Sequence, residues 1–262
     1  MKTLFTAVHP HYAYYENLLK AKSRRQKFWA IANYLLPGIV FTLLINIRFV
    51  HDSLSSLFHL SSREYQFWVL IALTFGWHMA YPLYALRVKE QLNWTGVLRA
   101  LNLDKLSLKG ILLITPLFFL IVLLFVVPYM GIVFPKVHSF LQSVEVLKTP
   151  EHSIFANYET MYGFHPWQLA LLFIGNFVGE EVYFRGYLMK KSAFLGKHNW
   201  WIHSLLFSFY HLWQIPMTYA LTFVVLVFGL FMVLRKNLYE LMLLHILINL
   251  VLPVVVQMVW YS

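Results

Sequence analysis

Long apolar runs recur along this chain, and each is close to the length that a helix needs to cross a bilayer, which is about 20 residues. The runs predict membrane spans at residues 28–50, 65–86, 110–130, 166–189, 199–214, 218–234 and 238–260. Composition agrees, because 60% of the 262 residues are hydrophobic and 12% are charged, whereas soluble domains carry about 25% charged residues. The sequence therefore predicts an all-α polytopic membrane protein with about seven or eight spanning helices.

Basic residues gather on one side of these predicted spans. They lie in residues 20–27, 87–109, 190–197 and 235–236, which all flank the same side when the spans alternate in direction. Lys and Arg are enriched in cytoplasmic loops, so we expect a multi-pass protein of the cell membrane with a cytoplasmic N-terminus. Topology then explains the formal net charge of +10, and we expect the lipid bilayer rather than nucleic acid as the partner.

Three parts of the chain differ in composition. Residues 1–27 form a basic segment predicted to be cytoplasmic. Residues 28–165 are predicted to hold the N-terminal spans, an interfacial helix within 87–109 and an outer loop over 131–165. Residues 166–262 are predicted to form the transmembrane core that carries the chemistry. The chain has no Cys, which excludes disulfides, thiol catalysis and Cys-based metal sites.

Three charged residues stand inside the apolar run at 166–189, namely Glu180, Glu181 and Arg185. Each charge at the centre of a spanning helix costs roughly 2.5 to 3.5 kcal/mol on insertion scales, so a functional site is expected there. Glu181 and Arg185 are four residues apart and can form an ion pair on one helix face. Glu180 points about 100° away from that pair and is our candidate general base.

Further polar residues occur in other predicted spans. His211, His245 and Asn249 are each more typical of hydrogen bonds between helices than of catalysis when taken singly. Counting about 1.5 Å of rise per residue places them at depths similar to that of Glu180, so the C-terminal helices are predicted to form one buried polar chamber. His78 either bonds a neighbouring helix or lines a cavity.

Three motifs in the C-terminal third resemble those of a known family. They are Glu180-Glu181-x-x-x-Arg185, Phe207-x-x-x-His211 and His245-x-x-x-Asn249. In this order within hydrophobic helices, they resemble the CPBP family of intramembrane proteases, which includes type II CAAX prenyl endopeptidases and bacteriocin-processing or Abi-like proteins. The resemblance extends over residues 166–253 and implies cleavage of a lipid-embedded or prenylated, CAAX-type peptide or protein.

The resemblance also implies a role for each motif residue. Glu180 and His211 would activate a water molecule, while His245 and Asn249 would stabilise the oxyanion. The supporting residues would be Glu181, Arg185 and Phe207. If a divalent metal such as zinc takes part, its ligands would be Glu180, His211 and His245; activation by glutamate and histidine needs no metal, and we expect none.

Two other classes of function stay open. A membrane scaffold or immunity protein could share the fold without proteolysis, because fold and function separate. A proton-coupled transporter also buries Glu, Arg and His, although such proteins usually show paired repeats with broken helices, which this sequence lacks. Zincin and serine-elbow motifs are not found, and both Asp residues, Asp52 and Asp104, lie outside the predicted spans.

Overall fold

The computed structural model describes residues 23–154, 163–215 and 222–260, which fold into helices without any strand. Within these ranges four helices are long and apolar enough to cross a membrane, namely Arg24–Asn46, Ser62–Lys89, Gly110–Ile132 and Leu238–Trp260, and the apolar helix Thr222–Arg235 is shorter. The prediction of an all-α polytopic membrane protein is thus confirmed. The predicted total of about seven or eight spans goes beyond these four and stays a prediction.

The first two long helices are built from several helical segments. Their bounds are α3 Arg24–Phe41 with η1 Thr42–Asn46, α4 Arg48–Leu57, α5 Ser62–Leu73, η2 Thr74–Ala80, α6 Tyr81–Tyr84 and η3 Ala85–Lys89. Both α3 and α5 begin at capping boxes. The hydroxyls of Ser23 and Ser61 accept hydrogen bonds from the backbone N–H groups of Gln26 and Glu64, whose side chains accept from the cap residues in return. These caps satisfy N–H groups that a helix start leaves free.

The segment predicted as an interfacial helix contains α7 Trp94–Ala100, which is capped by Asn93. Its place at the membrane surface stays a prediction.

Next come η4 Gly110–Ile114, α8 Thr115–Pro128, η5 Tyr129–Val133, α9 Phe134–Ser143 and η6 Glu145–Leu147. The prediction of a loop over 131–165 is therefore wrong for residues 134–143. Phe134, Val137 and Leu141 have helical spacing, and Pro135 suits the first turn. Residues 155–162 of that loop lie outside the described residues, as do residues 1–22 of the basic N-terminal segment.

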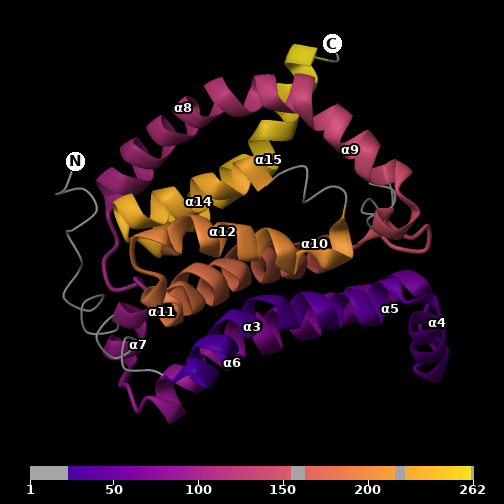
Figure 1. Ribbon diagram of the computed structural model, residues 1–262, viewed down its shortest axis with the longest axis horizontal. Helices are drawn as coiled ribbons and strands as arrows, with labels where there is room; N and C mark the ends of the chain where they lie inside the picture. The colour runs from indigo at the N-terminus through magenta and orange to yellow at the C-terminus, as the bar shows by residue number, and fades with distance from the viewer. Residues whose placement is uncertain (1–22, 155–162, 216–221, 261–262) are drawn as a thin grey trace.

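The C-terminal half carries the three motifs. Its elements are α10 Pro166–Phe173, η8 Ile174–Gly179, η9 Glu181–Leu188, α11 Met189–Lys191, η10 Ala193–His198, α12 Asn199–Tyr210, η11 Leu212–Gln214, α14 Thr222–Arg235 and α15 Leu238–Trp260. In Figure 1, α3 runs beside α5 and α6 along one side, α8 arches over the other side, and α10, α12, α14 and α15 lie between them. Helix α12 packs against both α3 and α14, so the two halves of the chain share one interior.

The helices run between two ends of the molecule, which the contacts between segments identify. At one end Lys191 pairs with Glu90, and the backbone N–H of Leu238 donates to the carbonyl of Asn102 (3.1 Å). We call this the basic end, because it gathers residues 87–109, 190–197 and 235–236. At the opposite end the hydroxyl of Thr149 donates to the carbonyl of Ile215 (2.8 Å). Figure 1 shows α7 and α11 at the basic end and α4 at the opposite end.

Candidate active site

Glu180 lies between the helical segments η8 and η9, and its side chain is buried. Its Oε1 atom is 3.7 Å from Nε2 of His211 and accepts a hydrogen bond from the Tyr210 hydroxyl at 3.5 Å. As the helix geometry predicted, the partners of Glu180 come from another helix rather than from its own. The structure thus brings Glu180 and His211 together, although they are 31 positions apart in the sequence.

His211 follows the last residue of α12, and its ring is oriented by the helix that it ends. Its Nδ1 lies 2.9 Å from the backbone carbonyl of Phe207. Because a carbonyl only accepts hydrogen bonds, Nδ1 carries the proton in the neutral ring and Nε2 presents its lone pair to Glu180. The spacing of four residues between Phe207 and His211 therefore fixes the tautomer that a base beside Glu180 requires.

The predicted ion pair between Glu181 and Arg185 is confirmed, with Oε1 3.0 Å from a guanidinium nitrogen and both side chains fully buried. The same Oε1 atom lies 2.8 Å from Nδ1 of His245, so one carboxylate joins η9 to α15. The guanidinium stacks on the ring of Phe207, with its central carbon 3.8 Å from the ring centroid. This cation–π contact accounts for the aromatic residue in the motif.

Among the described residues, no hydrogen bond joins Asn249 to Glu180. Its side chain is exposed, and its amide nitrogen donates to the carbonyl of His245 one turn earlier in α15 (3.0 Å). Counting residues along a helix gives depth, whereas the direction in which a side chain points depends on how the helix is rotated against its neighbours. The oxyanion roles predicted for His245 and Asn249 therefore rest on the family resemblance, with His245 held by Glu181 in this arrangement.

An apolar cavity of about 350 Å³ reaches Glu180. Its polar lining residues are Thr74, Asn176, Glu180, Tyr210 and Gln214, and the rest of the lining is apolar. Its walls come from α3, α5, η2, α10, η8, η11 and α15 as well as from Tyr210, so the N-terminal half contributes to it. Sequence reasoning missed Tyr210, for which adjacency to His211 is the only signal, and it missed the N-terminal wall, which has no polar motif.

His78 belongs to η2 and is completely buried beside this site. Its ring stacks on Tyr183 (5.2 Å between ring centroids) and meets Tyr210 edge-on (5.4 Å). Within the described part of the chain, neither ring nitrogen has a hydrogen-bond partner. The prediction that His78 either bonds a neighbouring helix or lines a cavity is therefore wrong, because aromatic rings enclose it.

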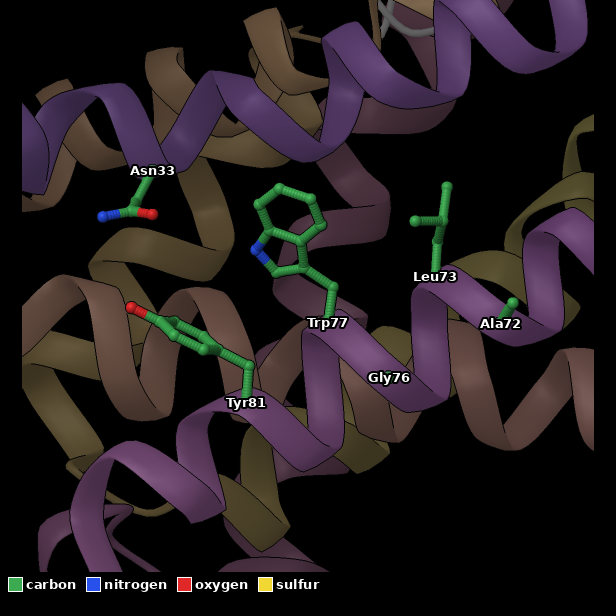
Figure 2. A pocket seen from close by; sticks show the side chains of 6 residues that line it. All are labelled: Asn33, Ala72, Leu73, Gly76, Trp77 and Tyr81. Carbon is green, nitrogen blue, oxygen red and sulfur yellow. The ribbon is translucent and has the colours of Figure 1, made fainter. Parts of the chain in front are cut away.

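A second, larger hollow of about 490 Å³ lies between α3 and the helix of η2. Figure 2 shows Trp77, Tyr81 and Asn33 around it. The indole N–H of Trp77 donates to the Tyr183 hydroxyl (3.0 Å), which donates to the carbonyl of Asn33 (2.7 Å). The lining residues of this hollow include no carboxylate and no histidine, so the smaller cavity at Glu180 is the candidate active site.

If a metal takes part, its predicted ligands are Glu180, His211 and His245. Among the residues that the structure describes, no group of three or more His, Cys, Asp or Glu side chains is placed to hold a metal ion. The contact of His245 with Glu181 already engages its Nδ1. These residues do not fit a metal site as arranged, and no step below involves a metal.

Residues 163–251 match the family model described as type II CAAX prenyl endopeptidase Rce1-like. No curated protein and no solved structure matches the chain. The matched range includes all three motifs, from Glu180 to Asn249, and leaves out the helices α3 to α9. Residues 163–251 are thus similar to type II CAAX prenyl endopeptidases, and this match supports the assignment to the CPBP family that the three motifs predict.

Proposed function

We propose that this protein is an intramembrane endopeptidase that hydrolyses a peptide bond of a lipid-embedded or prenylated substrate with water activated by Glu180 and His211. The observation that carries the proposal is the apolar cavity in which Glu180, among the described lining residues, is the one carboxylate. Its volume falls in the usual range for ligand pockets, about 300 to 1,000 Å³. An apolar cavity with one carboxylate beside one histidine suits a hydrophobic peptide and a general base.

Water activation follows from the spacing of the two residues. Glu180 Oε1 and His211 Nε2 are 3.7 Å apart, so one water molecule can lie at about 2.8 Å from both. Glu180 takes a proton from this water as its oxygen attacks the scissile carbonyl carbon. The bond between that carbon and the amide nitrogen then breaks, and the proton passes to the leaving amine. The products are a carboxylic acid and an amine, and Glu180 is restored.

The negative charge of the intermediate develops on the scissile carbonyl oxygen. His245 is suited to face it, because Glu181 holds the ring through Nδ1 (2.8 Å) and leaves Nε2 available for the oxyanion. Asn249 would reach the oxyanion only after its amide leaves the carbonyl of His245. Glu181, Arg185 and Phe207 hold this arrangement in place and make no direct contact with the reacting atoms.

Cleavage by detergent-purified protein tests the proposal. The panel contains prenylated CAAX peptides and unmodified hydrophobic peptides, each with a fluorescent donor and quencher, and compares the wild type with Glu180→Gln. Glu145→Gln is a matched control, because it makes the same chemical change at an exposed position. We expect cleavage by the wild type and by Glu145→Gln and loss of cleavage in Glu180→Gln, with no effect of a chelator.

Other outcomes distinguish the alternatives. Loss of activity with chelator and its return with zinc would overturn the metal-free mechanism. Cleavage that survives Glu180→Gln would remove Glu180 from the mechanism. If a folded wild-type protein cleaves no peptide while its cellular effect persists in Glu180→Gln, the scaffold or immunity function replaces the peptidase.

A further inference from the structure

The cavity beside Glu180 extends toward only one end of the molecule. On the helix of Glu180 its other lining residues fall within 169–177, all between Glu180 and the start of α10. Gln214 follows the end of α12, and Leu70 lies in the first half of the helix that begins at Ser62. Helices α5 and α10 start, and α12 finishes, at the end opposite to the basic end. The cavity therefore runs from Glu180 to that opposite end.

Toward the basic end the interior next to Glu180 is filled, and the hollow at Trp77 and Tyr81 does not have Glu180 among its lining residues. Tyr34, Phe184 and Leu188 are almost completely buried there. The hydroxyl of Tyr34 lies 2.8 Å from both Ser192 Oγ and His203 Nδ1, so hydrogen bonds join α3, the chain after α11, and α12. A substrate that approaches from the basic end would have to break this packed and hydrogen-bonded layer, whereas the opposite route is already open.

Two lining residues show where the cavity meets its surroundings. Leu169 of α10 is 39% exposed and Leu250 of α15 is 52% exposed. Both are apolar, and both belong to helices with apolar surfaces. An opening between such helices faces lipid rather than water, so it suits an apolar segment that enters sideways from the bilayer.

We propose that the substrate enters from the extracytoplasmic half of the membrane, as an apolar peptide segment whose scissile bond lies in that half. The proposal rests on the proposed function and on the retention of basic segments in the cytoplasm, which makes the open end of the cavity extracytoplasmic. A prenylated CAAX protein presents its C-terminus from the cytoplasm and would meet the filled end. Secreted or membrane-inserted peptides are thus the favoured substrate class.

Cysteine labelling tests the access route directly, because the natural chain has no Cys. Gln214→Cys and Leu169→Cys place a thiol at the open end of the cavity, and Lys197→Cys places one on the exposed basic end. Intact cells are treated with a membrane-impermeant maleimide, before and after permeabilisation. Size-exclusion elution of each variant checks that it folds.

We expect Gln214→Cys to react in intact cells and Lys197→Cys to react only after permeabilisation. An apolar peptide added first should reduce the reaction of Gln214→Cys. Leu169→Cys should react with a lipid-soluble maleimide if it lines a lipid-facing opening. The reverse pattern, with Lys197→Cys labelled in intact cells, would overturn the extracytoplasmic assignment. Failure of Gln214→Cys and Leu169→Cys to react with either reagent in folded protein would overturn the open route.

Cleavage in proteoliposomes tests the substrate class. One substrate is a single-span peptide with its scissile bond in the extracytoplasmic half, and the other is a prenylated CAAX peptide. A scissile bond that cannot reach its catalytic groups loses about 100-fold or more in rate, so we expect the single-span peptide to be cleaved at least that much faster. Faster cleavage of the CAAX peptide would overturn this inference and leave the peptidase function in place. No cleavage of either would overturn the peptidase function, and the labelling result alone would then decide the access route.

Discussion

Gly38 in α3 is the residue through which the N-terminal half most directly positions the candidate active site. A Cβ atom added at Gly38 would lie 1.9 Å from the carbonyl oxygen of Tyr210. Tyr210 donates to Glu180 and is followed by His211. A Gly38→Ala substitution therefore changes the distance between α3 and α12 at the point where α12 presents both residues to Glu180.

The structure sets the size of this effect. An ordinary contact is 3.4 Å or more, so the helices must separate by about 1.5 Å to accommodate the methyl group. Overpacking of this kind costs typically about 1 to 3 kcal/mol. In a helix, alanine is more favourable than glycine by about 1 kcal/mol, which offsets part of this loss of stability. Misplacement of catalytic groups by about 1 Å can reduce the rate about 100-fold, so activity should fall much more than stability.

The assay measures cleavage of the best peptide and the thermal unfolding midpoint in detergent. Gly76→Ala is the matched control, because a Cβ atom at Gly76 would meet nothing within 4 Å. We expect Gly38→Ala to lose about 100-fold in kcat/KM while it remains folded, and Gly76→Ala to match the wild type. Wild-type activity in Gly38→Ala, or an equal loss in both variants, would refute the inferred contact between α3 and α12.

Three further predictions concern buried polar groups. Glu181→Gln or Arg185→Met alone should lower the free energy of unfolding by roughly 3 to 5 kcal/mol, because each leaves the other charge unpaired. The double variant should lower it by less than either single variant, and additive losses would contradict the pairing. His78→Phe should raise the free energy of unfolding by about 1 to 3 kcal/mol, since its ring nitrogens have no partner among the described residues, and a lower stability would show that a partner exists. At the basic end, outside the spans, burial lowers the pKa of Lys190 from 10.5 to about 7. The unfolded chain then holds more protons between these values, so stability should rise from about pH 7 to pH 10.5; Lys190→Met should flatten that rise, and an unchanged slope would exclude Lys190 as its source.

Helical periodicity explains what could be predicted about the site. Residues four apart share a helix face, which is why the pairing of Glu181 with Arg185 and the separate direction of Glu180 followed from spacing alone. Counting residues along each span placed His211 at a depth similar to that of Glu180, and the two side chains lie 3.7 Å apart in the structure. Both features depend only on positions within one helix or on depth along the membrane normal, and both can be counted from the sequence.

What could not be predicted depends on how the helices are rotated and packed against each other. Spacing did not show that the Asn249 amide would donate to its own helix or that aromatic rings would enclose His78. It also gave no sign that α3 and α5 would form a wall of the cavity, because residues such as Leu70 look like any lipid-facing leucine. Helix α9 was missed for a different reason, since its polar residues obscured a valid helical pattern.

Hydrolysis in ¹⁸O-labelled water is the measurement that tests the central claim most directly. A single turnover of the wild type on the best peptide is analysed by mass spectrometry of the product and of the fragment that contains Glu180. Water activated by Glu180 should place one ¹⁸O atom in the new carboxyl group and none in Glu180, and the Glu180→Gln variant should form no product. Label in the Glu180 side chain, or labelled product from the Glu180→Gln variant, would contradict the account.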